Sequence, residues 1–167
     1  MLQLLVVSLL LFCAMAYDED RMRVTRSAEI IINGPIDKVF PLFTPAGEKL
    51  WIPSWHYVPI YPAGGETERD MVFRTDEHTL WTLALYDPPH RSIYVHTSPE
   101  ELARIEVECS AIDANHTRMR ITYVITAITE HAQQVAAERQ SDAEFRKKME
   151  QWKLWLDAYA VKVGWTR

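Results

Sequence analysis

The chain has 167 residues, which is the size of one globular domain and too short for two ordinary ones. Its 48% hydrophobic and 25% charged residues are typical of a folded protein and exclude a disordered chain. The formal net charge of −5 argues against a non-specific nucleic-acid binder. Two cysteines exclude a disulfide-rich scaffold and a four-cysteine zinc site.

Residues 1–16 form an apolar segment with the features of a signal peptide. The stretch Leu4–Phe12 is shorter than the about 20 apolar residues that a membrane-spanning helix needs. Ala14 and Ala16 supply the small residues of a cleavage site, although no Lys or Arg precedes the apolar run. We expect a cleaved segment 1–16, an N-terminal extension 17–26 and a single domain over 27–167. Cleavage implies a periplasmic or secreted protein, whereas an uncleaved anchor or a start at Met22 stays open as the alternative, the latter with a cytoplasmic location.

Cleavage would also remove Cys13 and leave Cys109 as the sole cysteine, which excludes an internal disulfide. Cys109 has no basic neighbour in the sequence that would lower the pKa of its thiol. We therefore predict that Cys109 is buried and chemically inert.

The first predicted element of the domain is a strand at Val24–Asn33, rich in β-branched residues. Apolar spacing then predicts a short helix over Ile36–Phe43, opened by Pro35. A second short helical segment is expected at Gly47–Ile52. Turns rich in Pro, Gly, Asp and Asn separate the strands of a predicted antiparallel meander, which are His56–Tyr61, Asp70–Thr75, Glu77–Tyr86, Ser92–Ser98, Leu102–Ile112 and Thr117–Thr129.

Apolar and polar side chains alternate most clearly in the last two of these strands. The positions of one face are Ala103, Ile105, Val107, Cys109 and Ala111 in one strand, and Met119, Ile121, Tyr123, Ile125 and Ala127 in the next. Arg, Glu, Thr and Ser dominate the positions between them. Since neighbouring residues of a strand point to opposite faces, the sheet is predicted to have one buried and one solvated face.

The segment Glu130–Lys162 contains neither Gly nor Pro, which predicts one long C-terminal helix. Its apolar residues recur at spacings of three and four and are Phe145, Met149, Trp152, Leu156, Tyr159 and Val163. The residues predicted to face solvent include Glu144, Arg146, Lys147, Lys148, Glu150 and Lys153. The fold class is therefore predicted as α+β, with a curved antiparallel sheet of six or seven strands wrapped on this helix and two short helices after the first strand.

Three parts of the sequence carry a resemblance to a known superfamily. Ala28–Phe40 is a strand leading straight into a short helix, and Gly47–Trp55 is the second motif. The later landmarks are Val72-Phe73, Thr79-Leu80-Trp81 with Tyr86-Asp87, and Met149–Trp152. Together they resemble the START-like (SRPBCC) superfamily with its helix-grip fold, in particular an uncharacterised bacterial branch related to polyketide cyclase and lipid-transport-like proteins. The resemblance extends from Ser27 to Lys162 and implies a cavity between sheet and long helix, but members of the superfamily serve many functions.

Large apolar side chains of the sheet and helices would line such a cavity. The predicted lining consists of Trp51, Trp55, Phe73, Trp81, Leu83, Ile105, Val107, Met119, Ile121, Tyr123, Phe145, Met149 and Trp152, with Met71 as a further candidate. The alternative that these residues fill a solid core stays open. Four polar side chains could point into the cavity and bind a polar group of a ligand, and we call them polar hooks. They are His56, Tyr94, His96 and Tyr159. Trp51, Trp55 and Tyr57, if exposed together, would form an apolar rim at the cavity mouth suited to a membrane or a partner.

Catalytic and metal-binding motifs are not recognisable in the sequence. His90 and His96 are spaced one residue wider than the iron-binding histidines of ring-hydroxylating relatives, and they follow a turn rather than a helix. We therefore predict no metal and no cofactor, and we find no pair of titratable groups clearly forced into one dry site. If the protein is an enzyme, the side chains that could polarise a carbonyl or move a proton are Tyr94, Tyr123, His56 and Tyr159.

Three functions are compatible with these observations. The favoured one is binding or transport of a small hydrophobic ligand of lipid, aromatic or polyketide-like character. The second is a polyketide cyclase-like enzyme that acts on such a molecule by acid/base chemistry. The third is an interaction module without a ligand. The predicted partner is therefore a small hydrophobic molecule and not a nucleic acid, and the acidic net charge weighs against anionic lipid surfaces.

Overall fold

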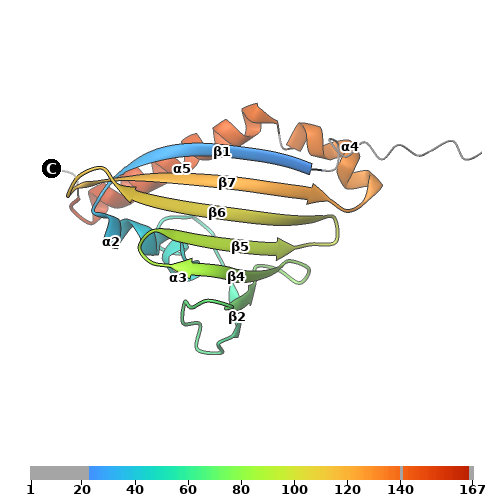
Figure 1. The fold of residues 1–167 in the computed structure, drawn as a ribbon, viewed down its shortest axis with the longest axis horizontal. Coiled ribbons are helices and arrows are strands. Elements are labelled where there is room, and N and C mark those ends of the chain that lie inside the picture. Colours follow the sequence, from blue (N-terminus) through green and yellow to red (C-terminus); the bar gives the residue numbers. More distant parts are fainter. Residues whose placement is uncertain (1–22, 140, 166–167) are drawn as a thin grey trace, which may run out of the picture.

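A seven-stranded antiparallel sheet forms the framework of the protein (Figure 1). The computed structural model describes residues 23–139 and 141–165, so the predicted signal-peptide-like segment 1–16 lies outside the described residues. The strands follow the spatial order β1-β7-β6-β5-β4-β3-β2. Their bounds are β1 (Arg23–Asn33), β2 (Val58–Tyr61), β3 (Val72–Arg74), β4 (Leu80–Asp87), β5 (Arg91–Thr97), β6 (Glu101–Ala111) and β7 (His116–Ala127).

The first two strands in the sequence lie at opposite edges of the sheet. The chain between β1 and β2 must therefore cross the whole sheet, and it does so through three short helices, α2 (Ile36–Val39), η1 (Phe40–Phe43) and α3 (Pro45–Glu48). Figure 1 shows these helices behind the sheet, together with the C-terminal helix. This crossing places residues of short helices opposite the centre of a sheet face.

Strand β1 begins earlier than the predicted domain boundary. Arg23 already pairs with Thr126 of β7, and the pairing continues without a break to Asn33 opposite His116. Residues 23–26 are thus part of the sheet. Strand β4 also differs from expectation, because it begins at Leu80 rather than at Glu77. The Asp76 side chain accepts the backbone N–H groups of His78 and Thr79 at 2.8 and 2.7 Å, and these bonds replace the expected strand pairing there.

The predicted single C-terminal helix is wrong, because the chain forms two helices, α4 (Glu130–Arg139) and α5 (Asp142–Lys162). Ser141 is the N-cap of α5, and its hydroxyl accepts the backbone N–H of Glu144 at 3.3 Å. Ser followed by Glu three residues later is a capping-box pattern, which starts a new helix without any Gly or Pro. Helix α5 keeps most of the predicted apolar stripe, because Phe145, Met149 and Leu156 are buried and Trp152 and Tyr159 are partly buried. Val163 was predicted wrongly, since it follows the end of α5 and is exposed.

The core lies between the inner face of the sheet and the helices. In β6 and β7 the burial follows the predicted alternation, except that Ala111 at the end of β6 is exposed. The largest fully buried side chains are Phe40, Phe43, Phe73, Ile32, Met71, Leu83, Met119, Ile121 and Leu156. Cys109 is a free, buried cysteine, and burial raises the pKa of its thiol to about 12, which makes it unreactive.

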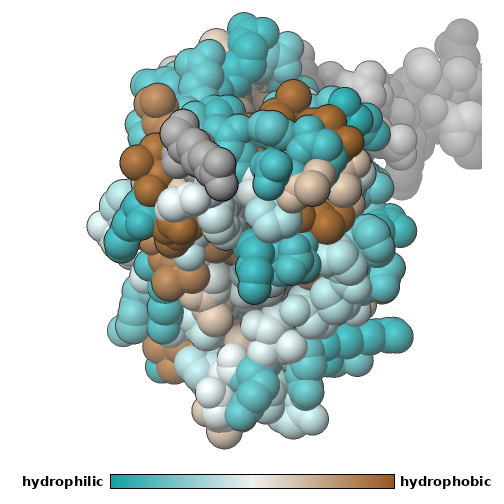
Figure 2. All heavy atoms as spheres, turned by 90° about the vertical axis from the view of Figure 1, so that its left-hand side faces the viewer, coloured by the Kyte–Doolittle hydropathy of each residue, from teal (hydrophilic) through white to brown (hydrophobic). Residues whose placement is uncertain are grey.

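Among the described residues, no helix is both long enough and apolar enough to cross a membrane. Figure 2 shows the end of the molecule that lies at the left of Figure 1, where hydrophilic and hydrophobic side chains are interspersed over the visible surface.

Candidate functional site

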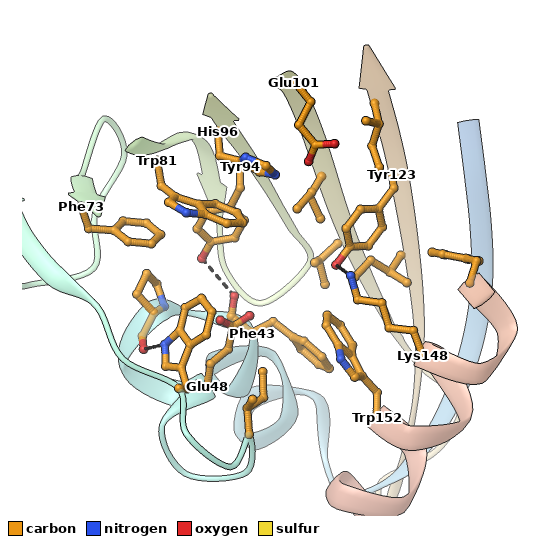
Figure 3. Close-up of a pocket in the computed structure, with 18 of the residues that line it drawn as sticks. Phe43, Glu48, Phe73, Trp81, Tyr94, His96, Glu101, Tyr123, Lys148 and Trp152 are labelled. Atoms are coloured by element: carbon orange, nitrogen blue, oxygen red, sulfur yellow. Dashed lines mark hydrogen bonds between the residues drawn. The ribbon is translucent and has the colours of Figure 1, made fainter. Parts of the chain in front are cut away.

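A cavity of about 460 Å³ lies between the inner face of the sheet, helix α5 and the short helices (Figure 3). Of the two predicted alternatives, a cavity and a solid core, the structure has the cavity, because the space between sheet and helix is not completely filled. Most of the lining is apolar and consists of Phe43, Pro45, Ile52, Trp55, Phe73, Trp81, Ile105, Val107, Ile121, Ile125, Phe145 and Trp152. The polar part of the lining is Glu48, Tyr94, His96, Glu101, Tyr123, Glu144 and Lys148.

The structure brings most of the predicted lining residues together around this space. Those that reach the cavity wall are Trp55, Phe73, Trp81, Ile105, Val107, Ile121, Tyr123, Phe145 and Trp152. Four others, Trp51, Leu83, Met119 and Met149, are buried but do not line the cavity, and Met71 is likewise core. Met119 lies near the start of β7, and α2 packs against β6 and β7.

The predicted apolar rim does not exist. Trp51 and Tyr57 are only 5% and 7% exposed, and Trp55 is partly buried. The indole N–H of Trp51 donates to the Leu42 carbonyl at 2.7 Å, and its ring packs edge-on against Trp152. Trp51 is therefore a buried structural residue that fills the space beside Trp152.

Two of the four predicted polar hooks lie in the cavity wall. Tyr94 and His96 reach the cavity from β5, whereas His56 is exposed and Tyr159 packs edge-on against Trp165 away from the cavity. The hydroxyl of Tyr94 donates to the buried Phe43 carbonyl at 2.9 Å. This hydrogen bond ties the short helices to the sheet.

His96 packs its ring against Trp81, with 4.2 Å between the ring centroids. Its buried Nδ1 has no hydrogen-bond partner among the described residues. Burial, and to a smaller extent the charge of Lys148, lowers the pKa of His96 to about 4. The imidazole is therefore neutral at physiological pH and forms part of an aromatic wall.

Glu48 is the polar residue that sequence analysis missed. It projects from the end of α3 into the cavity (Figure 3). Within the described part of the chain, its carboxyl makes no hydrogen bond and no ion pair. Burial raises the pKa of the Glu48 carboxyl to about 8, although the positive charge of Lys148 acts in the opposite direction. Glu48 is thus a carboxylic acid that is mostly neutral at pH 7 and faces an apolar space.

The backbone before Glu48 is locked in place by local contacts, and α3 starts and ends earlier than the predicted helix Gly47–Ile52. The Thr44 hydroxyl accepts the Gly47 N–H at 3.0 Å and donates to the Pro41 carbonyl at 2.8 Å. A Cβ at Gly47 would lie 1.9 Å from that same carbonyl oxygen, so only glycine allows α3 to approach η1 so closely. This packing aims the side chain of Glu48 at the sheet.

Lys148 is exposed, as predicted, and it also reaches the cavity wall opposite Glu48. Its ammonium donates to the Tyr123 hydroxyl at 3.1 Å and lies 4.2 Å from the centroid of that ring. The Trp152 ring is 5.6 Å away. Although Lys148 is exposed overall, its charged end lies over aromatic rings at the cavity wall.

The sequence analysis identified no pair of titratable groups in one buried site, but the structure brings four such groups to one cavity. Glu48, Tyr94, His96 and Lys148 share the wall of one cavity, where the charge of Lys148 lowers the pKa values of Glu48 and His96. Burial and the neighbouring Glu48 raise the pKa of Tyr94 well above its ordinary value. In the described ranges, no cluster of three His, Cys, Asp or Glu side chains could hold a metal ion.

No family model matches the chain, and no curated protein matches it. Several solved structures do. Ara h 8.0201 aligns with a TM-score of 0.62 at 12% identity, over 84% of this chain and 99% of that one. A protein from Mesorhizobium loti aligns with a TM-score of 0.61 at 12% identity, over 83% and 98%. PFC0360w, an HSP90 activator from Plasmodium falciparum, aligns with a TM-score of 0.51 at 16% identity, over 86% and 96%.

The chain has the helix-grip fold of START/Bet v 1-like proteins. The order of strands, the short helices after β1 and the packed C-terminal helix thus confirm the predicted fold class. Proteins of this fold commonly bind hydrophobic ligands. Because the identities are low, these similarities define the architecture, and the function must be argued from the cavity.

Proposed function

We propose that the protein binds a small, largely apolar molecule in the cavity between the sheet and α5, as a carrier or a sensor. The observation that carries this proposal is the cavity itself, with about 460 Å³ of space walled mainly by aromatic and aliphatic side chains. Protein interiors are normally packed to the density of organic crystals, so a space of this size costs stability unless a ligand occupies it. If residues 1–16 are cleaved, the ligand is handled outside the cytoplasm.

The test is to identify what the protein holds when it is purified from its own host. Native mass spectrometry followed by solvent extraction should reveal one bound small molecule per chain. An empty protein that also fails to bind fatty acids, sterols and aromatic polyketides would exclude the carrier function.

A matched pair of variants locates the binding site. Ile121→Trp adds volume to the cavity wall on β7 and should abolish retention of the ligand. Ile31→Trp adds the same volume on β1, where Ile31 is 49% exposed, and should leave retention unchanged. Thermal unfolding of both variants checks that they are folded, and Val107→Phe provides a milder filling of the same cavity.

An acid/base enzyme is the second candidate, and one observation favours it. Glu48 is a carboxylic acid with a raised pKa in an apolar cavity, close to Tyr94 and across from Lys148. Such a group exchanges protons readily near neutral pH. Incubating the extracted ligand with fresh protein distinguishes the two functions, because an enzyme converts many equivalents of the molecule and a carrier returns it unchanged.

A further inference from the structure

We infer that the molecule bound in this cavity carries a protonated amine, which pairs with the carboxylate of Glu48 while its apolar part lies against the aromatic walls. The inference rests on the proposed function, because it names the chemical class of the same ligand. Three features of the cavity lead to it.

The first feature is that Glu48 lacks a partner within the described residues. The Lys148 ammonium, the obvious candidate, is engaged at the opposite wall with the hydroxyl and ring of Tyr123. A carboxyl that faces an apolar cavity without a hydrogen bond is costly unless a bound group satisfies it. A ligand cation at this position would supply both a charge and hydrogen-bond donors.

The second feature is the nature of the surrounding aromatic rings. The indole N–H groups of Trp55 and Trp81 donate to the Pro45 carbonyl at 2.9 Å and to the Thr75 hydroxyl at 3.0 Å. The donors of these side chains are therefore already used, and the rings contribute apolar surface and π electrons to the cavity. Aromatic surfaces combined with a carboxylate favour a cationic ligand, since ring faces attract positive charge.

The third feature is the balance of charge on the cavity wall. The lining includes the carboxyl side chains of Glu48 and Glu144 and the ammonium of Lys148, which is engaged with Tyr123. His96 adds no positive charge at neutral pH because burial lowers its pKa to about 4. Once Glu48 is ionised, the carboxylates of Glu48 and Glu144 outnumber the ammonium of Lys148, and the net charge of −5 of the whole chain also attracts cations.

Proton release follows from this pairing. Before binding, Glu48 holds a proton at pH 7 because burial raises the pKa of its carboxyl to about 8. Binding of an amine cation favours the ionised carboxylate, so the protein must release that proton. The titratable groups that share the cavity wall with Glu48 are Tyr94 and His96 on β5, Glu101 on β6, Tyr123 on β7, and Glu144 and Lys148 on α5. The pKa of Tyr94 is raised and that of His96 is lowered, both away from neutrality.

The experiment compares three fluorescent probes that share one ring system and differ in charge. They are 9-(aminomethyl)anthracene, 9-(hydroxymethyl)anthracene and anthracene-9-carboxylate, titrated into the protein at pH 7. The amine should bind at least about tenfold more tightly than the alcohol, as expected for one charge-assisted pair. Its affinity should rise by up to about tenfold per pH unit between pH 6 and pH 8, whereas the affinity of the alcohol should not change.

Glu48→Gln should remove both the preference for the amine and its pH dependence, while the alcohol binds as before. Glu150→Gln is the matched control, because Glu150 is exposed on α5 and does not line the cavity. Calorimetry in phosphate and in Tris supplies a readout on the native protein alone, with close to one proton released per amine bound and none per alcohol.

The outcomes separate this inference from the function on which it rests. Equal binding of alcohol and amine, an amine preference that survives in Glu48→Gln, or binding without proton release would overturn the inference and leave the apolar binding function intact. Failure of all three probes to bind the native protein would count against both.

Discussion

Two carboxylates on opposite sides of the sheet show how differently this fold treats charge. Glu106 lies on the outer face of β6, where Arg104 binds it at 2.7 Å and Arg91 binds it as well. Partial burial acts against ionisation of Glu106, but the hydrogen bonds and charges of the two arginines outweigh it and lower the pKa of its carboxyl. Glu48 lies on the inner side without such partners, and burial raises the pKa of its carboxyl to about 8.

The difference between the two sites lies in what can replace a lost contact. Water reaches the outer face and can solvate any group that loses its partner, so each ion pair there contributes little. On the inner side, single buried hydrogen bonds hold the short helices to their surroundings, such as that from the Tyr94 hydroxyl to the Phe43 carbonyl. Changes around Glu48 should therefore affect stability strongly, and changes around Glu106 only weakly.

Trp51→Ala should have the largest effect on stability, because it disrupts the packing between the sheet and the short helices, close to Glu48. The substitution removes a 5% exposed ring between Phe43 and Trp152 and the hydrogen bond to the Leu42 carbonyl. We expect the free energy of unfolding to fall by about 3–5 kcal/mol, measured by urea denaturation. Trp55→Ala, at a partly buried position of the cavity wall, is the comparison and should cost clearly less; similar losses would mean that Trp51 is not a special anchor.

Glu48→Gln should increase stability, and the gain should depend on pH. The carboxyl of Glu48 has a pKa of about 8 in the folded chain and an ordinary value of 4.5 in the unfolded chain. The native protein therefore loses stability as the pH rises from 4.5 to 8, because folding retains a proton that the unfolded chain has released. The variant should be more stable by about 2–4 kcal/mol at pH 8.5, and the difference should vanish at pH 4.5.

Urea denaturation at the two pH values measures this gain, with Glu150→Gln as a control that should not show it. A Glu48→Gln variant with the same pH profile as the native protein would show that the carboxyl is solvated within the cavity. In that case the contrast between the two faces of the sheet would disappear.

The sheet could be predicted from the sequence far better than the site. Strands β6 and β7 alternate almost throughout because one of their faces is buried, and this pattern determines which side chains point inward independently of the rest of the chain. The cavity depends instead on how three short helices cross the sheet, which is a matter of tertiary packing. No local pattern distinguishes a cavity from a filled core.

Glu48 and Lys148 illustrate two kinds of missed signal. A glutamate at the end of a four-residue helix normally faces solvent, and only the crossing from one sheet edge to the other carries Glu48 into the interior. Lys148, in contrast, stands three residues after Phe145 and four before Trp152, both of which line the cavity. Residues at these spacings share one side of a helix, so the sequence could have predicted that Lys148 lies at the cavity.

Glu106→Gln should have the smallest effect on the free energy of unfolding. It should destabilise the protein, whereas Glu48→Gln should stabilise it, so this variant tests the contrast between the two carboxylates directly. Because the pKa of the Glu106 carboxyl is lower in the folded chain, its stabilising contribution is present above the unfolded pKa and is lost as the pH falls through the folded value. The variant should be less stable than the native protein by no more than about 1 kcal/mol at pH 7, since the pair is partly solvated. At pH 3 and in high salt the two proteins should converge, because protonation or screening has already removed the contribution. A loss at pH 7 as large as that of Trp51→Ala would show that the outer face, too, depends on contacts that water cannot replace.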